Sequence, residues 1–438
     1  MSETNICVVG LGYVGLPTAL AFHNKGFKIY GVDVSDEIVE KLRSGKSHLV
    51  DSSAKLRIPI NDDSWKVSSE FHEAVGMSDV VLITVPTPVN EDKSPDFGYV
   101  EAASHSVLSN LDRRKRTVVV LESTVFPGIT RRILGGICEK LDLTDGKEVV
   151  LAYCPERVSP GEANFSVESV ARVVGCDDED TGRMLASLYG QITDSSSDYV
   201  GKLEVAEASK MVENLQRDID IALANELSIV LPRIGVDVED VLDAADTKWN
   251  FHRHTPGIGV GGHCIPVDPY YYISLARSVG YESILSITAR SINENMPMIS
   301  VDEIQLLIGG DSLAGKRVLV LGYSYKPNVG DIRETPIKDF IKYITEKGGD
   351  AIVWDPLIDS SEFPNNAKIT DDPYQVTEID AVILATAHEE VLRLDWERIM
   401  NQCNKPVIYD GRRVLEKEKF TSKGWIFSAV GMPIPEGG

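Results

Sequence analysis

A glycine-rich segment that ends in a cysteine and an aspartate could carry nucleophilic chemistry. Four glycines fall within Gly257–Gly262, Cys264 follows directly after His263, and Asp268 comes four residues later. Glycines let the backbone approach a ligand closely, and a thiolate is a strong nucleophile when its pKa is lowered. A free cysteine is more often buried and inert, so both interpretations are open for Cys264. His263 could be an activating base or a hydrogen-bonding loop residue.

A row of polar residues offers a second candidate site. Apolar residues recur at three- and four-residue spacing through residues 202–235, which predicts one long helix. Lys210, Asn214 and Arg217 follow at intervals of four and three residues, so they share one face of that helix. A solvated polar face usually explains such a row. The helix lacks a clearly separate polar stripe, however, so a functional role is equally open.

The segment Gly10–Gly15 has the spacing of a dinucleotide-binding turn. It reads GLGYVG, follows the β-branched run ICVV and precedes a helical stretch. The glycines allow the tight turn, the approach of a pyrophosphate and close packing of strand and helix, while the helix N-terminus receives the phosphates. Asp33, eighteen residues after Gly15, ends the next strand. A carboxylate there favours NAD over NADP because it repels a 2′-phosphate, although a strand-end aspartate also often caps a turn.

Two stretches of alternating strands and helices would position these groups. β-Branched runs alternate with helical segments from Asn5 to about Val200 and again from Lys316 onward. This alternation predicts an α/β fold of two Rossmann-like, doubly wound parallel sheets joined by the long helix. Further helices are expected at Val236–Asp246 and Tyr271–Gly280. The strands are expected within residues 6–10, 28–34, 79–86, 117–124, 148–155, 316–326, 351–356, 380–387 and 405–411.

The chain length requires more than one domain. At 438 residues the protein exceeds the usual size of a single core. We expect an N-terminal domain over residues 1–200, a central helical domain over 201–300 and a C-terminal α/β domain over 301–438. A cleft between two such halves is a preferred place for a small-molecule site.

Composition excludes several classes of protein. Lys and Arg number 44 against 67 Asp and Glu, a formal net charge of −23 that repels phosphate backbones and anionic membranes. We therefore expect neither a nucleic-acid nor a membrane partner. The six cysteines form no CxxC pair, which argues against a disulfide framework and a zinc site. A signal-peptide pattern and a long apolar window are both missing, so we expect a cytoplasmic protein. We also expect no metal.

These motifs, taken in order, resemble the UDP-glucose/GDP-mannose dehydrogenase family over nearly the whole chain. They are GLGYVGLPTA, VPTP, EST, YCPERVSPG, ANE, GGHCIPVDP, LGYSYKPNVGDIRE, WDP and DGRRVL. The resemblance implies an NAD-binding Rossmann domain, a central helical dimerisation region that makes a homodimer, and a C-terminal domain that holds UDP. It also implies a four-electron oxidation of C6 of a sugar nucleotide from alcohol to carboxylate, with two NAD consumed per sugar.

The resemblance assigns Cys264 the role of nucleophile. In the family scheme the thiolate captures the aldehyde as a thiohemiacetal, which is oxidised to a thioester and then hydrolysed. Lys210 and Asn214 match the pair that stabilises the developing oxyanions. Asp268 matches a carboxylate that assists proton removal through water.

Other residues match family positions at the acid/base centre and at the two ligands. Glu156 matches the acid/base group of thioester hydrolysis, and Thr124 helps to place the water. The implied cofactor-binding residues are Gly10, Gly12, Tyr13, Val14, Gly15, Asp33, Pro86, Thr87, Thr124 and Arg333. The implied substrate-binding residues are Glu156, Arg157, Lys210, Asn214, Arg217, Arg253, Gly261, Lys326 and Arg412, with Arg253 placed to reach the partner subunit's site.

The identity of the sugar is left open by the same motifs. YCPERVSPG and GGHC differ from the corresponding segments of UDP-glucose enzymes and are similar to the branch that oxidises UDP-N-acetylhexosamines. YCPERVSPG favours UDP-N-acetylmannosamine slightly, whereas KWNF at Lys248–Phe251 and VDPYY at Val267–Tyr271 also look like UDP-N-acetylglucosamine enzymes. UDP-N-acetylgalactosamine and UDP-glucose are further alternatives. The uronate product would serve polysaccharide or glycan synthesis.

Two rival classes share parts of this pattern. One is a catalytically silent sugar-nucleotide sensor, which would have no reason to keep Cys264, Lys210 and Asp268 together. The other is a two-electron NAD dehydrogenase of the 6-phosphogluconate type, which needs no nucleophilic cysteine. The cysteine segment argues against both.

Overall fold

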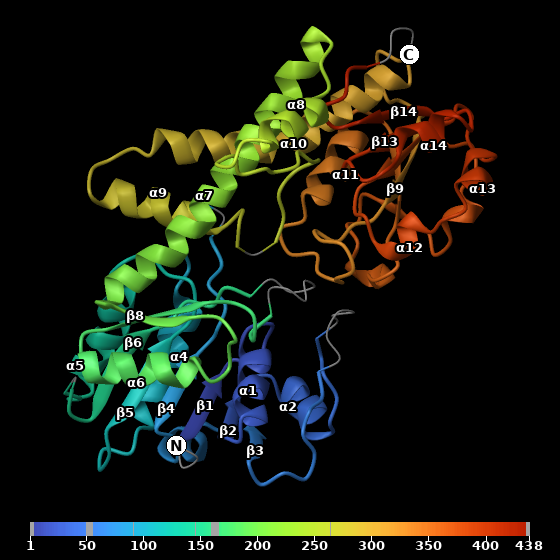
Figure 1. Ribbon diagram of the computed structural model, residues 1–438. Helices are drawn as coiled ribbons and strands as arrows, with labels where there is room; N and C mark the ends of the chain where they lie inside the picture. Colours follow the sequence, from blue (N-terminus) through green and yellow to red (C-terminus); the bar gives the residue numbers. More distant parts are fainter. Residues whose placement is uncertain are drawn as a thin grey trace. The chain divides into compact units, whose positions relative to one another are not determined.

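The protein consists of two compact units, each built around its own sheet (Figure 1). The computed structural model describes residues 4–49, 56–90, 92–144, 146–158, 166–262 and 264–434. Unit 1 comprises Met1–Asn214 and Tyr270–Glu282, and unit 2 comprises Leu215–Pro269 and Ser283–Gly438. The three-domain division stays a prediction.

Unit 1 holds an eight-stranded sheet in the order β3-β2-β1-β4-β5-β6-β7-β8. The inner runs TVVVL and VVLAY are buried at every position, as expected for parallel strands covered on both faces. The strands are β1 Asn5–Val9, β2 Lys28–Val32, β3 Trp65–Ser68, β4 Val80–Ile83, β5 Thr117–Leu121, β6 Val149–Tyr153, β7 Arg172–Cys176 and β8 Ser197–Gly201. The helices are α1 Gly15–Asn24, α2 Asp36–Arg43, α3 Phe71–Gly76, α4 Gly98–Ser109, the π-helical turn η1 Arg131–Gly135, α5 Gly136–Lys140 and α6 Glu179–Tyr189.

One strand pair of unit 1 departs from the expected parallel arrangement. β6 and β7 pair antiparallel, whereas all other neighbours in this sheet are parallel. The strands β3, β7 and β8 were not predicted from the sequence. WKVS mixes buried and exposed positions and SDYVG has no fully buried position, so both short stretches carry a weak strand signal.

Unit 2 holds a six-stranded, fully parallel sheet in the order β11-β10-β9-β12-β13-β14. The strands are β9 Arg317–Leu321, β10 Asp350–Trp354, β11 Lys368–Ile369, β12 Ala381–Leu384, β13 Val407–Asp410 and β14 Ile426–Ala429. The helices of this block are α11 Pro336–Glu346, α12 Glu389–Leu392, α13 Trp396–Met400 and α14 Lys417–Thr421, with short 3-10 turns at η4 Ser360–Glu362 and η5 Pro373–Gln375. Separate apolar clusters pack against this sheet. The two sheets confirm the predicted fold class.

The helical segment between the sheets differs in detail from the sequence prediction. The long helix is α7, Leu203–Val230, and it gives way to a 3-10 turn, η3 Leu231–Ile234, because Pro232 lacks the N–H that would continue the helix. α8, Val238–Asp246, begins after the cap Asp237, whose carboxylate accepts the N–H of Glu239 at 2.9 Å.

Two helices correct the expectations for the remaining segment. α9 spans Asp268–Ser278, so Asp268 is the first helical residue and does not belong to the preceding loop. α10, Ile284–Leu307, was not predicted. Pro297 lies inside α10, and a proline in a helical pattern ordinarily argues for a break.

Candidate active site

The predicted cofactor residues of unit 1 follow the carboxyl ends of neighbouring strands. Gly10–Gly15 follow β1, Asp33 follows β2, Pro86 and Thr87 follow β4, and Thr124 follows β5. The strand order β2-β1-β4-β5 places these four segments side by side. Because carboxyl ends of parallel strands share one edge, unit 1 brings this set together where α/β proteins bind nucleotides.

The glycine turn after β1 leaves no space for side chains at its first and last glycine. Gly10 has φ +91°, and Thr84 Oγ1 donates a hydrogen bond to its carbonyl at 2.7 Å. A Cβ on Gly15 would lie 1.8 Å from the Gly10 carbonyl oxygen. By contrast, nothing lies within 4 Å of a Cβ built on Gly12. The open space beside Gly12 and the start of α1 at Gly15 fit a pyrophosphate bound at the helix N-terminus.

Asp33 serves the turn as well as any ligand. Its Oδ2 accepts the Leu11 N–H at 2.8 Å and its Oδ1 accepts the Ser35 N–H at 3.0 Å. Each carboxylate oxygen can accept a further hydrogen bond, so capping and ribose binding are compatible roles. Tyr13 and Val14 are half-buried on the same turn.

Lys210 and Glu156 meet within unit 1. Lys210 Nζ donates to the main-chain carbonyl of Glu156 at 2.6 Å, and the Glu156 carboxylate accepts the N–H of Val158. Lys210 and Asn214 are only 8% and 7% exposed, whereas Arg217, the third member of the polar row, is exposed. The burial of Lys210 and Asn214 is inconsistent with a simple solvated face. It places the Lys210 ammonium group beside the segment that follows β6, and Asn214 lies one turn further along α7.

A glutamate that the sequence reasoning missed anchors α7 to the sheet of unit 1. The Glu207 carboxylate is fully buried and accepts the N–H groups of Gly128, at 2.6 Å, and Thr130, at 2.9 Å. Burial raises its pKa, which these hydrogen bonds oppose. The turn that it holds follows Thr124, which is half-buried. Glu207 lies three residues before Lys210 and therefore fixes the helix face that carries it.

Glu122 of the EST motif is a second buried acid that was not singled out. Tyr189 donates its hydroxyl to Glu122 Oε1 at 2.6 Å, and Arg172 Nη1 lies 3.9 Å from Glu122 Oε2. Burial raises the pKa of Glu122 to about 7, although Arg172 and Tyr189 act in the opposite direction. The side chains of Arg172 and Glu122 are wholly inaccessible to solvent. The signal for them was an isolated Glu and Arg in strongly apolar surroundings.

The glycine segment of unit 2 packs against the residues that follow β9. A Cβ on Gly261 would lie 2.6 Å from Tyr325 Cβ, and one on Gly262 would lie 2.8 Å from the Tyr325 ring. The Gly262 N–H also donates to the Arg333 carbonyl at 3.1 Å. The glycines are therefore required by close packing, and they bring the segment before Cys264 next to the chain that carries Lys326.

Cys264 and Asp268 are joined by a turn that opens α9. The Cys264 carbonyl accepts the N–H groups of Val267, at 3.0 Å, and Asp268, at 2.8 Å. Cys264 is partly exposed, whereas Asp268 is 2% exposed. His263 lies outside the described residues.

Arg412 of unit 2 presents an unsatisfied guanidinium group. It follows β13, and its Nε donates to the Ala385 carbonyl at 2.6 Å, while its buried Nη2 has no hydrogen-bond partner among the described residues. Burial lowers its pKa to about 10, which Asp410 opposes. A Cβ on Gly257 would lie 3.5 Å from Arg412 Nη1, so the guanidinium lies beside the glycine segment. An arginine with unused donors is suited to a diphosphate.

Three of the other predicted arginines, Arg157, Arg253 and Arg333, are engaged by carboxylates. Arg157 Nε donates to Glu213 at 3.0 Å, and Arg333 Nε lies 3.0 Å from Asp331. Arg253 pairs with two acids of α8, Asp243 at 2.8 Å and Glu239. To bind a ligand, each of these arginines would have to share its carboxylate partner with the ligand or release it. The predicted ligand contacts of these arginines stay predictions.

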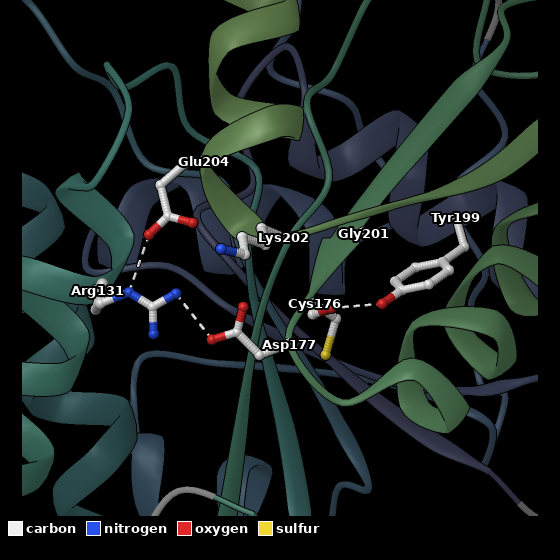
Figure 2. A pocket seen from close by; sticks show the side chains of 7 residues that line it. All are labelled: Arg131, Cys176, Asp177, Tyr199, Gly201, Lys202 and Glu204. Carbon is white, nitrogen blue, oxygen red and sulfur yellow. Dashed lines mark hydrogen bonds and ion pairs between the residues drawn. The ribbon is translucent and has the colours of Figure 1, made fainter.

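A pocket of unit 1 is lined by none of the predicted site residues. It has a volume of about 700 Å³ and lies where β8 meets α7, and Figure 2 shows the side chains that line it. The Arg131 guanidinium bridges Asp177 at 2.8 Å and Glu204 at 2.9 Å, so its positive charge offsets one of their two negative charges. The lining residues are Arg131, Cys176, Asp177, Tyr199, Gly201, Lys202 and Glu204.

The described ranges contain neither a group of metal ligands nor a membrane-spanning helix. No three His, Cys, Asp or Glu side chains there are grouped so that they could hold a metal ion. None of the described helices has the length and apolar character needed to cross a bilayer.

Comparison with known proteins identifies the family. Models of the UDP-glucose/GDP-mannose dehydrogenase family match in order: the NAD binding domain over residues 4–193, the central domain over 204–295 and the UDP binding domain over 319–417. A UDP-N-acetyl-D-glucosamine 6-dehydrogenase from Pseudomonas aeruginosa is 34% identical over 96% of this chain and 99% of its own length. The chain belongs to the UDP-glucose/GDP-mannose dehydrogenase family.

Solved structures support the same membership. A UDP-N-acetyl-D-mannosamine dehydrogenase from Pyrococcus horikoshii is 31% identical over 97% of this chain and 99% of its own length. A structure of the UDP-D-ManNAc dehydrogenase from that organism has a TM-score of 0.86 at 30% identity, covering 99% of this chain and 100% of that one. A UDP-glucose dehydrogenase from Pyrobaculum islandicum has a TM-score of 0.84 at 29% identity and 98% coverage of both chains. The protein is an NAD-dependent nucleotide-sugar dehydrogenase, as the resemblance predicted.

Proposed function

We propose that this dehydrogenase oxidises C6 of a UDP-N-acetylhexosamine to the uronate, with UDP-N-acetylmannosamine as its preferred substrate. Relatives at 34% and 31% identity over nearly the whole chain act on UDP-N-acetyl-D-glucosamine and UDP-N-acetyl-D-mannosamine. The observation that carries the proposal is the Cys264–Asp268 turn, which follows a glycine segment packed against the chain of Lys326. A two-electron dehydrogenase has no use for a cysteine placed there.

The first oxidation would use the buried pair on α7. The glycine turn after β1 would hold NAD, whose nicotinamide would supply the hydride acceptor for both oxidations. The Lys210 ammonium and the Asn214 amide stabilise the alkoxide that forms as the C6 hydroxyl loses its proton. Asp268 accepts that proton through a water molecule. The substrate carbon is then an aldehyde.

The second oxidation would proceed on a covalent adduct. The Cys264 thiolate forms a C–S bond to the aldehyde carbon, and the carbonyl oxygen takes a proton to give a thiohemiacetal. Loss of the second hydride and of the hydroxyl proton leaves a thioester. Glu156 removes a proton from water, the water oxygen attacks the thioester carbon, and the C–S bond breaks to return the thiolate. One alcohol, one water and two NAD thus give one carboxylate, two NADH and three protons.

A panel of UDP-sugars tests the substrate. Purified protein with NAD is expected to form two NADH per UDP-N-acetylmannosamine and to turn over UDP-N-acetylglucosamine more slowly. Rapid oxidation of UDP-glucose with no activity on either acetylated sugar would overturn the proposed branch. Faster oxidation of the gluco sugar would reverse the order of the two acetylated sugars.

Replacement of the nucleophile tests the covalent step. Cys264→Ser is expected to lower uronate formation at least about 100-fold, because a serine hydroxyl is not ionised near neutral pH. Cys403→Ser is the matched control. Cys403 is also partly exposed and also belongs to unit 2, but it follows α13 and is remote in sequence from the glycine segment. Mass spectrometry of product and NADH counting would check both variants. Uronate formed by Cys264→Ser at a near-native rate contradicts the thiohemiacetal scheme.

We further propose a cytoplasmic homodimer without nucleic-acid or membrane partners, whose product enters polysaccharide or glycan synthesis. Leu223 and Val230 of α7 are each 51% exposed and Trp249 is 92% exposed, an apolar display typical of a surface that a second copy covers. Light scattering during size-exclusion chromatography tests the dimer. A mass of one chain at micromolar concentration would contradict it.

A further inference from the structure

A buried histidine and aspartate lie at the carboxyl edge of the sheet in unit 2, where the mechanism above gives them no role. His388 follows β12, Asp355 follows β10, and β9 lies between these strands. His388 Nε2 is 3.1 Å from Asp355 Oδ2, and both side chains are completely inaccessible to solvent. A buried carboxylate beside an imidazole requires a structural or functional reason.

The hydrogen bonds define a single tautomer of His388. The Asn328 main-chain N–H donates to His388 Nδ1 at 2.9 Å. Because a backbone N–H can only donate, Nδ1 must carry the lone pair and the ring proton must be on Nε2. That proton points to Asp355 Oδ2, so the carboxylate orients the imidazole.

Asp355 is held as a carboxylate by several donors. Its Oδ2 also accepts the N–H groups of Tyr323, at 2.7 Å, and Ser324, at 2.9 Å, together with the Ser324 hydroxyl at 2.8 Å. Burial acts to raise its pKa, but the hydrogen bonds from His388 and these backbone groups hold the pKa well below its usual value. The charge therefore persists throughout the neutral range.

These contacts hold both ends of the segment that follows β9. Asp355 binds its beginning at Tyr323 and Ser324, and His388 binds its end at Asn328, which has φ +61°. A left-handed asparagine is held there only if its surroundings compensate for the strain. Between the two ends lie Tyr325, which packs under the glycine segment, and Lys326.

We propose that His388, oriented by Asp355, is a positioning residue for the nucleotide part of the substrate. By accepting the Asn328 N–H, His388 fixes the backbone conformation of residues 323–328. That conformation determines the position of Lys326 and the way Tyr325 packs against Gly261 and Gly262. This inference rests on the proposed function, because it takes Lys326 as a UDP-binding residue. His388 acts through that segment and touches no reacting atom.

Two substitutions separate the contacts of His388. His388→Asn keeps an oxygen near the position of Nδ1 to accept the Asn328 N–H but does not reach Asp355. His388→Gln keeps a donor toward Asp355 but loses the acceptor for Asn328. Calorimetric titration with UDP alone, and with NAD alone, measures binding without turnover. His105→Gln is the control, since His105 is exposed on α4 of unit 1.

The expected result is selective. His388→Gln weakens UDP binding and raises KM for the UDP-sugar at least about 10-fold with little change in kcat, whereas His388→Asn stays within about 3-fold of the wild type. NAD binding is unchanged in both variants. If Lys326 transmits the effect, Lys326→Met and the double variant Lys326→Met/His388→Gln bind UDP equally weakly.

Several outcomes overturn the inference. The inference is wrong if His388→Gln binds UDP as tightly as the wild type. It is also wrong if both His388 variants lose UDP binding to the same extent, or if NAD binding is lost in parallel. A wild-type protein that fails to bind UDP overturns the proposed function together with the inference. Should His388→Gln fail to fold, His388→Leu, which likewise lacks an acceptor for the Asn328 N–H, takes its place with the same expected loss of UDP binding.

Discussion

At the scale of single residues, Gly261 illustrates how tightly the cysteine segment is packed. A Cβ on Gly261 would lie 2.6 Å from Tyr325 Cβ and 2.8 Å from Pro336 Cδ. Both neighbouring atoms are close to the main chain or within a ring, so they cannot move aside as the end of a flexible side chain could. A single added methyl group must therefore displace the segment that leads to Cys264.

We predict that Gly261→Ala lowers kcat/KM for the UDP-sugar at least about 100-fold, because a displacement of about 1 Å at a reacting group has an effect of that size. Steady-state kinetics checks the loss, and an unchanged far-UV circular dichroism spectrum shows that the fold is kept. Gly136→Ala is the control, since nothing lies within 4 Å of a Cβ at that helical glycine. Similar activity of the two variants would contradict the packing argument.

At the scale of elements, a chain of buried hydrogen bonds joins α7 and α10 to the glycine segment. Arg290 Nη1 donates to Asp218 Oδ1 at 2.6 Å, and Asn293 donates to the same oxygen at 2.7 Å. Asn225 donates to Asn293 Oδ1 at 2.8 Å and accepts the Gly257 N–H at 3.1 Å. Burial raises the pKa of Asp218, which Arg290 opposes. The ion pair thus sets the orientation of the amides that hold the beginning of the segment.

Removing the cation should leave a buried carboxylate without its partner. We expect Arg290→Met to lower the free energy of unfolding by about 3–5 kcal/mol, the usual cost of breaking a buried ion pair. Arg277→Met, which breaks the exposed pair of Arg277 with Glu282, should change it by less than about 1 kcal/mol. Urea unfolding followed by circular dichroism measures both. Equal losses would show that the network does not stabilise the helix pair.

At the scale of the whole molecule, one buried and one half-buried glutamate make stability depend on pH. Burial raises the pKa of Glu122 in unit 1 and of Glu303 in unit 2 from 4.5 to about 7, although hydrogen bonds from Tyr189 and Tyr409 oppose the shift. Between these values the folded protein holds protons that the unfolded chain has released. The free energy of unfolding must therefore fall as pH rises through this window, and it levels off above it.

We predict that Glu303→Gln reduces this fall. The amide oxygen can still accept the Tyr409 hydroxyl, which lies 2.6 Å from Glu303 Oε2, and the variant has no proton to lose. Its free energy of unfolding should decrease less between pH 5 and pH 8 than that of the wild type, by up to about 3 kcal/mol. Glu390→Gln, an exposed change, is the control. Identical slopes for all three proteins would contradict the shift.

The whole-molecule charge also limits how the two anionic ligands are held. With a net charge of −23, the distant field opposes both NAD and a UDP-sugar. The attraction must therefore be local. Under the proposed function, unit 1 would offer the start of α1 and the buried Lys210. Unit 2 would offer Lys326 and Arg412, whose Nη2 has no hydrogen-bond partner among the described residues. These groups act within the distance over which salt screens the surrounding field.

The sequence by itself determined the features that depend on local order. The buried β-branched runs, the turn at Gly10–Gly15 and the helix that became α7 follow from periodicity and glycine spacing over short stretches. The ordered motifs identified the family and its cofactor. The start of α9 at Asp268 and the helix α10 around Pro297 escaped detection, because local rules place prolines and turns outside helices and packing overrides them.

Only the tertiary structure decided which distant residues touch. The contacts of Glu207 with Gly128, of Asp355 with His388 and of Gly261 with Tyr325 join segments that no periodicity relates. They exist because the order of strands brings particular carboxyl ends side by side and because packing leaves space for a glycine alone. The sequence shows which chemical groups are present, but strand order and close packing determine which of these groups contact one another.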